Sequence, residues 1–374
     1  MQTSSWFQRY LLPGFAFKAV VIGGGYATGR ELVEFFLPSG PHGGLMAMIF
    51  AGAIWSVICI ATFLFARATH SEDYRTFFRH LLGRGWILFE MAYCLLIVLI
   101  LAVFGAAAGA LGAALFGWPP LVGTLCLVAG ISLFVAFGNA SVEQLFKWVS
   151  FFLYGVYGLF LVLALGKFGD RIAANFALDV PTDGWAFAAV TYTGYNIVGA
   201  VAILPVLRHL RSNRDAVIAG ALCGPLAMIP AILFFVCMVA YYPEISAEAL
   251  PSDYMLQRLG FPLFHGLFQL MIFAALLESG TGSVHAVNQR IAQVWRARFN
   301  RDLSARSRFI TAGVLLVIAM FFADRFGLVK LIASGYRTLS YVLIVVYVLP
   351  LLTYGVWLLW QGRGQVAVAA PEKI

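Results

Sequence analysis

The sequence predicts an all-α integral membrane protein with ten transmembrane helices in two inverted repeats of five. Its 374 residues are 61% hydrophobic and only 11% charged, with a mean hydropathy of +0.88. A soluble domain carries about 25% charged residues, so most of this surface must face lipid. Apolar runs follow one another with short polar loops between them, and two of the runs contain glycines and polar residues. We therefore expect a single membrane domain over residues 1–374.

A helix needs about 20 apolar residues to cross a bilayer, and ten apolar runs are candidates for such spans. In order they are Leu11–Leu37, Gly44–Arg67, Trp86–Leu115, Leu121–Phe137, Val142–Leu165, Trp185–Leu210, Asp215–Val239, Phe264–Val294, Phe309–Phe322 and Tyr336–Trp360. The segment Phe326–Ser334 is either an interfacial helix or the start of the tenth span, broken at Gly335.

The basic residues lie on one side of this topology. If the N-terminus is cytoplasmic, nearly all Lys and Arg of the loops fall on the inner side, as the positive-inside rule requires. The net charge of +8 is therefore explained without nucleic acid as a partner. The N-terminal stretch has no cleavage site of a signal peptide, and the five cysteines lack metal-site spacing. We expect a multi-pass protein of the cell membrane with both termini in the cytoplasm.

The first and sixth runs are interrupted. The first reads AVVIGGGYATGRELVEFF, with three consecutive glycines followed by Arg30, Glu31 and Glu34, which are costly to expose to lipid. The sixth reads FAAVTYTGYNIVGAVAILP and is polar in its middle. A helix breaks at membrane depth only where it is buried or lines a cavity. Both breaks are therefore predicted to face the protein interior.

The two interrupted runs open two halves of five spans each. Because five is odd, the second half enters the bilayer from the opposite side. Halves of like fold would be inverted copies, here over residues 11–166 and 185–360. Paired interrupted helices in inverted repeats indicate a central binding site of a transporter.

These features resemble the LeuT-like amino acid–polyamine–cation superfamily. The stretches IGGGYATGRELVEFF, YTGYNIVGAVAILP and FGNASVEQLFKW more specifically resemble the YkvI-type membrane proteins. The resemblance covers nearly the whole chain. It implies alternating access, with a substrate held at the two breaks and often a sodium ion or proton coupled to it.

At a break, unpaired N–H groups favour anions and unpaired C=O groups favour cations. A zwitterion such as an amino acid suits both, with tyrosines as walls of the pocket. Alternatively, the glycines only allow close helix packing and the tyrosines are buried aromatics. The candidate substrate-binding residues are Gly23, Gly24, Gly25, Tyr26, Ala27, Thr28, Thr191, Tyr192, Gly194, Tyr195 and Asn196.

The eighth run, FAALLESGTGSVHAVNQR, carries ionisable and hydroxyl residues. Glu278, Thr281, His285 and Asn288 are spaced by three or four residues and are predicted to share one helix face. The resemblance implies a sodium site formed by small hydroxyl residues here, near Thr281. Glu278 and His285 favour proton coupling instead, or Glu278 forms a structural ion pair, for instance with Arg30. The candidate ion-coupling residues are Ile22, Glu278, Ser279, Thr281, Ser283 and His285.

We therefore interpret the chain as a secondary active transporter of a small charged or zwitterionic solute, most readily an amino acid or relative. The alternative is a membrane sensor or channel that binds a solute without accumulating it. The sequence gives no support for an enzyme, because its His and Cys residues do not cluster. The expected partners are a small-molecule substrate and the lipid bilayer. No cofactor is expected besides a coupling Na⁺ or H⁺.

Overall fold

The computed structural model describes residues 5–137, 139–301 and 304–361, and every regular element in these ranges is a helix. The first half contains the helical segments η1 (Phe7–Leu11), α1 (Leu12–Val21), α2 (Gly24–Ala27), α3 (Arg30–Phe36), η2 (Leu37–Ser39), α4 (Gly40–Ala68), α5 (Tyr74–Leu82), η3 (Gly83–Gly85), α6 (Trp86–Phe116), α7 (Pro120–Phe137) and α8 (Asn139–Phe176). The motif FGNASVEQLFKW falls where α7 passes into α8, and its side chains lie outside the described residues.

The second half follows a connection without regular structure. It contains α9 (Trp185–Asn196), α10 (Val198–Ala202), η4 (Leu204–His209), α11 (Asn213–Val239), η5 (Glu244–Ala247), α12 (Pro251–Leu259), α13 (Pro262–Phe299), α14 (Ala305–Lys330), η6 (Leu331–Tyr336), α15 (Arg337–Leu343), η7 (Ile344–Val348), η8 (Leu351–Gly355) and α16 (Val356–Trp360).

The last helix begins earlier than its apolar run predicts. Gly327 has φ 70° and ψ 168°, which is not helical, and it divides α14 into two helices at a kink. Only glycine adopts such a backbone without strain. From there the chain stays helical through η6, which contains Gly335. The predicted break at Gly335 is therefore wrong, and Phe326–Ser334 forms the kink and the start of the last helix.

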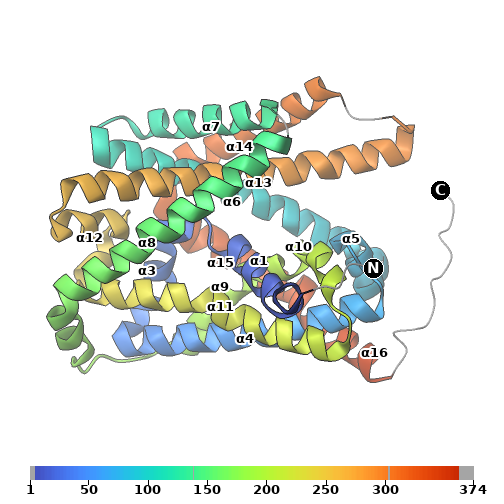
Figure 1. Ribbon diagram of the computed structural model, residues 1–374, viewed down its shortest axis with the longest axis horizontal. Coiled ribbons are helices and arrows are strands. Elements are labelled where there is room, and N and C mark those ends of the chain that lie inside the picture. Colours follow the sequence, from blue (N-terminus) through green and yellow to red (C-terminus); the bar gives the residue numbers. More distant parts are fainter. Residues whose placement is uncertain (1–4, 138, 302–303, 362–374) are drawn as a thin grey trace.

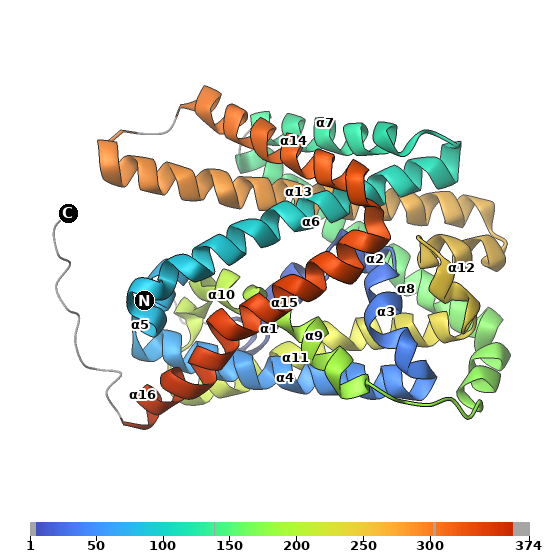
Figure 2. The same ribbon diagram turned by 180° about the vertical axis from the view of Figure 1, so that it is seen from behind.

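Most helices pack in two layers (Figures 1 and 2). In one layer α4 runs along α11, with α1 on α11 and α9 on α4. In the other layer α6, α7, α13 and α14 pack together. Figure 1 also shows α8 crossing diagonally between the layers. The helix α15 contacts both α9 and α6 and so bridges the two layers.

Small residues allow the helices of each layer to approach closely. A Cβ atom at Gly224 of α11 would collide with the Gly52 carbonyl of α4, and one at Gly123 of α7 would collide with the Ala108 carbonyl of α6. Such contacts are typical of helices in lipid, where the hydrophobic effect does not drive helices together. They fix the layers as rigid walls around the site.

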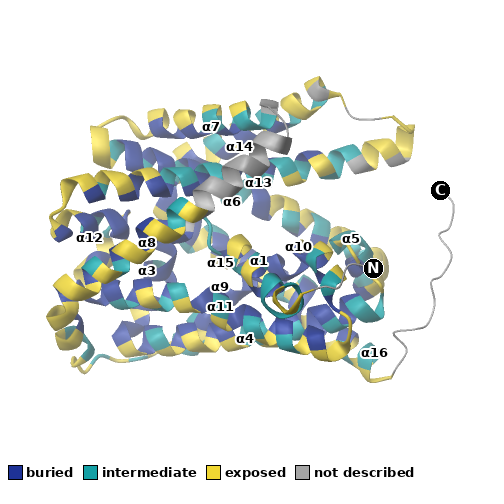
Figure 3. Cartoon of the chain, in the orientation of Figure 1, coloured by how far each residue is buried: buried dark blue, intermediate teal, exposed yellow. Residues whose placement is uncertain are grey.

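The outward surface is apolar. Large side chains such as Phe151, Val162 and Leu263 are 69, 69 and 88% exposed. Figure 3 shows exposed residues gathered along the outer faces of the helices and buried residues between them. Among the described residues, six helical stretches are long and apolar enough to cross a membrane, including Arg30–Ala68, Asn213–Val239 and Arg306–Trp360. The chain is a multi-pass membrane protein, and ten as the number of spans stays a prediction.

Candidate functional site

The first predicted break contains two stretches of non-helical backbone. The helix α1 ends at Val21, and Ile22 has φ −82° and ψ 80°. After the single turn of α2, Gly29 takes the left-handed conformation with φ 79° before α3 begins. A Cβ at Gly29 would also press on Phe234, Met238 and Pro251, so both its φ and its packing favour glycine.

The second predicted break is much milder. Ile197 separates α9 from α10 but keeps right-handed angles, φ −65° and ψ −16°. Its N–H still bonds to the Thr193 carbonyl at 3.0 Å, whereas the Ala200 N–H bonds to the Ile197 carbonyl only three residues away, at 2.9 Å. The helix is therefore wound more tightly at this point, and its backbone hydrogen bonds are not opened. The interruption of both helices within the membrane therefore stays a prediction.

A cavity of about 380 Å³ lies beside these segments. Helices α1, α3, α6, α8, α9, α10 and α13 and segment η6 all contribute to its wall. Its floor is buried and includes Glu31, Tyr195 and Tyr336. Its rim is exposed and includes Ala202 and Ala286. The cavity thus runs from a buried floor to exposed residues, and its volume is within the usual range of small-molecule sites.

Seven predicted site residues line this cavity. From the first break come Ile22 and Gly23, from α9 Tyr195 and Asn196, and from α13 Glu278, Ser279 and Ser283. Tyr26 and Ala27 instead line a separate, mostly apolar cavity of about 160 Å³, together with Ile22 and Lys18. Gly24 and Gly25 form the start of α2, and their accessibility lies outside what is described.

Four other predicted residues are absent from both cavity walls in the described part of the chain. Thr28 is fully buried. The Thr191 hydroxyl donates to the Phe187 carbonyl at 2.8 Å within its own helix. Tyr192 packs its ring against Phe36 at 4.7 Å. A Cβ at Gly194 would lie 2.8 Å from Ser340, so this glycine serves close helix packing.

The cavity face of α13 differs from the predicted one. It consists of Ala275, Glu278, Ser279, Gly282, Ser283 and Ala286. Thr281, His285 and Asn288 lie on the same side of the helix as Glu278, as their spacing predicts, but they are absent from the cavity wall in the described part of the chain. Thr281 and Asn288 are buried, and His285 bonds to Gln289 at 2.8 Å. Of this predicted face, Glu278 alone lines the cavity in the described residues.

The comparisons with known proteins give one curated relative and many structural neighbours. No protein-family model matches the chain. The uncharacterized membrane protein YkvI of Bacillus subtilis (strain 168) is 23% identical over 333 residues, covering 88% of this chain and 91% of YkvI. A Na⁺-coupled sialic acid symporter matches with a TM-score of 0.64 and 14% identity, over 95% of this chain and 82% of the symporter.

Two further solved structures match over nearly their whole length. MhsT in complex with L-phenylalanine gives a TM-score of 0.55 and 18% identity, over 96% of this chain and 99% of MhsT. Mhp1, a nucleobase-cation-symport-1 family transporter, gives 0.55 and 13%, over 99% and 97%. The chain has the LeuT fold. The resemblance predicted from the motifs is confirmed, and the neighbours of this LeuT fold are transporters and not enzymes.

In this LeuT fold the cavity is sealed on the side of α12. The Arg30 guanidinium bonds to the Glu34 carboxylate at 2.7 Å and to the Ser246 and Glu248 carbonyls at 2.9 Å. The Ser252 N–H, in the first turn of α12, bonds to the Thr28 carbonyl at 3.0 Å. Arg30 thus pairs with Glu34. It does not form the ion pair with Glu278 that the sequence analysis gave as an alternative. The loop before α13 is fastened directly onto the first break.

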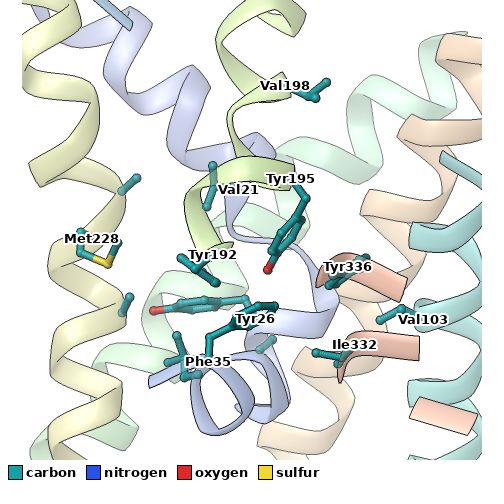
Figure 4. Packing of buried hydrophobic residues seen from close by; sticks show 14 of the residues in the cluster. Val21, Tyr26, Phe35, Val103, Tyr192, Tyr195, Val198, Met228, Ile332 and Tyr336 are labelled. Carbon is teal, nitrogen blue, oxygen red and sulfur yellow. The ribbon is translucent and has the colours of Figure 1, made fainter. Parts of the chain in front are cut away.

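The sequence analysis missed five lining residues with polar side chains, which are Lys18, Glu31, Tyr93, Tyr154 and Tyr336. Glu31 and Tyr336 lie at the cavity floor, and Lys18 stands near the rim with its ammonium 4.4 Å from the centre of the Tyr154 ring. Figure 4 shows Tyr195 and Tyr336 next to each other near the end of α1. The available signal was the charge of Glu31 directly after a helix break. Such a charge is costly to expose to lipid, so it points to a polar interior there.

Proposed function

We propose that the chain is a secondary active transporter that moves a small charged or zwitterionic solute across the cell membrane by alternating access. The LeuT fold supports this, because its structural neighbours include a sodium-coupled symporter and a nucleobase-cation transporter. The observation that carries the proposal is the cavity itself. It lies at the first helix break, is walled by both halves of the chain, and extends from a buried floor at Glu31 to exposed residues such as Ala202 and Ala286.

The two ends of the cavity support an inward-facing state. The rim residues Ala202 and Ala286 precede the basic segments around Arg208 and Arg296, which the positive-inside rule assigns to the cytoplasm. The opposite end carries α12 and the hydrogen bonds of Arg30 and Ser252. In Figures 1 and 2, α10 and α12 lie at opposite ends of the molecule. We infer that the solute leaves toward the cytoplasm and that both termini lie there.

The proposed site combines backbone and side chains. Ile22 and Gly23 offer main-chain groups at the break, and Tyr195 and Asn196 offer polar side chains from α9. The repeats over residues 11–166 and 185–360 would rock against each other around this point. An amino acid or a relative fits, because the site offers both backbone dipoles and charged side chains.

The coupling ion is proposed to act at α13. Glu278, Ser279 and Ser283 line the cavity opposite Gly23, where a Cβ would lie 3.8 Å from the Ser279 hydroxyl. Oxygen ligands of this kind suit a sodium ion, and a carboxylate inside a membrane also suits a proton. The two coupling ions differ in which gradient drives uptake.

Uptake into proteoliposomes tests the proposal. Radiolabelled amino acids, amines and nucleobases are offered under an imposed sodium or proton gradient, with empty liposomes as the control. A transporter accumulates at least one solute above its external concentration. A sensor binds a solute saturably in detergent without accumulation, and a channel only equilibrates it. Either of these results would replace the proposal by the alternative function.

A further inference from the structure

The carboxylate of Glu31 occupies an unusual place for a charged group. The residue is only 5% exposed, lies in the first turn of α3 and forms part of the buried cavity floor. Its Oε2 atom accepts a 2.6 Å hydrogen bond from the Tyr195 hydroxyl. An acidic residue within a membrane protein almost always faces the interior and pairs with another group, and a buried carboxylate without a cation is costly.

The described part of the chain supplies no cationic side chain for Glu31. Its neighbour Arg30 points the other way, to Glu34 and the carbonyls of the outer loop. Lys18, the cationic side chain of the cavity wall, makes a cation–π contact with the Tyr154 ring. The partner of Glu31 is therefore expected to come from solution.

The surroundings of Glu31 favour an organic cation over a metal ion. Tyr195 and Tyr336 stack with ring centres 4.4 Å apart and planes 16° apart, and both rings line the cavity. Ile97, Ile100 and Phe104 make the adjoining wall apolar. A hard cation such as Ca²⁺ or Mg²⁺ demands about six oxygen ligands, whereas an ammonium group is satisfied by a carboxylate and aromatic faces.

We propose that Glu31 is the specificity-determining residue of the cavity and that the solute is an organic amine, with or without a carboxylate. Its ammonium group binds the free oxygen of Glu31 beside Tyr195, and its apolar body lies against Ile97, Ile100 and Phe104. The inference rests on the proposed role of this cavity as the transport site. It deepens that role by making a positive charge, not a carboxylate, the feature that is recognised.

Ligand-induced thermal stabilisation of the detergent-purified protein tests the proposal with two matched triplets. The first is ethylamine, alanine and propionate, and the second is 2-phenylethylamine, phenylalanine and 3-phenylpropanoate. Each triplet keeps the apolar body and changes only the charged groups. Glu31→Gln keeps the shape of the side chain and removes its charge. Glu244→Gln makes the same charge change at an exposed loop position and serves as the control.

We expect the amines and amino acids of at least one triplet to raise the melting temperature, and the carboxylates not to. Glu31→Gln should weaken this binding by about tenfold or more, and Glu244→Gln should not change it. Stabilisation by the carboxylates, unchanged binding in Glu31→Gln, or no stabilisation by any amine would overturn the proposal. Glutamine mimics a protonated carboxyl group, so unchanged binding would point to a proton as the partner of Glu31.

This experiment separates the inference from the proposed function. Amine binding that requires Glu31, without accumulation in proteoliposomes, would leave the inference standing and remove the transporter function. Accumulation of a solute that carries no positive charge would leave the transporter function standing and remove the inference about Glu31.

Discussion

The Tyr195 hydroxyl donates a 2.6 Å hydrogen bond to the Glu31 carboxylate and thereby joins α9 to α3 at the floor of the cavity. The two residues are 164 positions apart and come from the two halves of the chain. Any ligand that binds Glu31 therefore contacts a junction between the halves. A transporter needs such a junction, because a ligand shifts a conformational equilibrium only through contacts that differ between the two states.

Gly23→Leu should abolish uptake. Gly23 lines the cavity at the first break, where a Cβ would lie 3.3 Å from the Phe104 ring and 3.8 Å from the Ser279 hydroxyl. A leucine side chain would fill the space proposed for the solute. Gly155→Leu, at an exposed position of α8 with nothing within 4 Å of its Cβ, is the matched control and should transport normally. Normal uptake by Gly23→Leu would argue against a solute at this break.

Glu278→Gln should change how uptake depends on the driving ion. Glu278 lines the cavity, and its neutral analogue can neither carry a proton nor neutralise a sodium ion. The initial uptake rate is measured as a function of pH and of sodium concentration, with equal amounts of reconstituted protein. We expect one of the two dependences to be lost. If both profiles match those of the unmodified protein, Glu278 has no part in coupling.

Ser279→Ala and Thr281→Val should differ. The Ser279 side chain lies at the cavity wall, whereas Thr281 is fully buried away from it. If sodium is the coupling ion, Ser279→Ala should raise the sodium concentration needed for half-maximal uptake by about tenfold, as expected for the loss of one ligand. Thr281→Val should leave that concentration unchanged. If Thr281→Val raises that concentration and Ser279→Ala does not, the sodium site lies near Thr281, as the sequence predicted.

Arg30→Gln should open the sealed side of the cavity. The substitution removes the bonds from the guanidinium to Glu34 and to the loop carbonyls of Ser246 and Glu248. A single cysteine at Ser279, with the five native cysteines replaced, reports access through a membrane-impermeant thiol reagent. Without Arg30→Gln, we expect labelling from the cytoplasmic side alone.

With Arg30→Gln, labelling from the outer side should increase severalfold. Replacing Arg325, an exposed residue of α14, by Gln is the charge-matched control and should leave labelling one-sided. Equal labelling with and without Arg30→Gln would mean that the loop is held by other contacts.

The helices could be predicted from the sequence because lipid imposes a simple pattern. Each run of about 20 apolar residues must form a helix, and basic loops orient it. The kink at Gly327 escaped prediction because Gly327 and Gly335 are equally plausible breaks in the sequence. Packing decides between them: a Cβ at Gly335 would lie 2.8 Å from Leu99, so Gly335 marks a close contact rather than a turn.

The site could be predicted only in part, because a short sequence pattern does not show which side of a helix faces the cavity. Arg30 and Glu34 are four residues apart and share the outer face of α3, whereas Glu31 is turned by about 100° and reaches the cavity. On α13, Glu278 and Thr281 lie on one side of the helix, but only Glu278 of the two lines the cavity. The sequence shows that such charges must be buried, but only tertiary contacts show which residue faces the solute.

The most direct test of the central claim is the steady-state accumulation of a radiolabelled amine in proteoliposomes under an imposed ion gradient. We expect an internal concentration above the external one, which collapses when an ionophore dissipates the gradient and is absent with Gly23→Leu. An internal concentration that never exceeds the external one, under both sodium and proton gradients and for every amine that binds the protein, would contradict it.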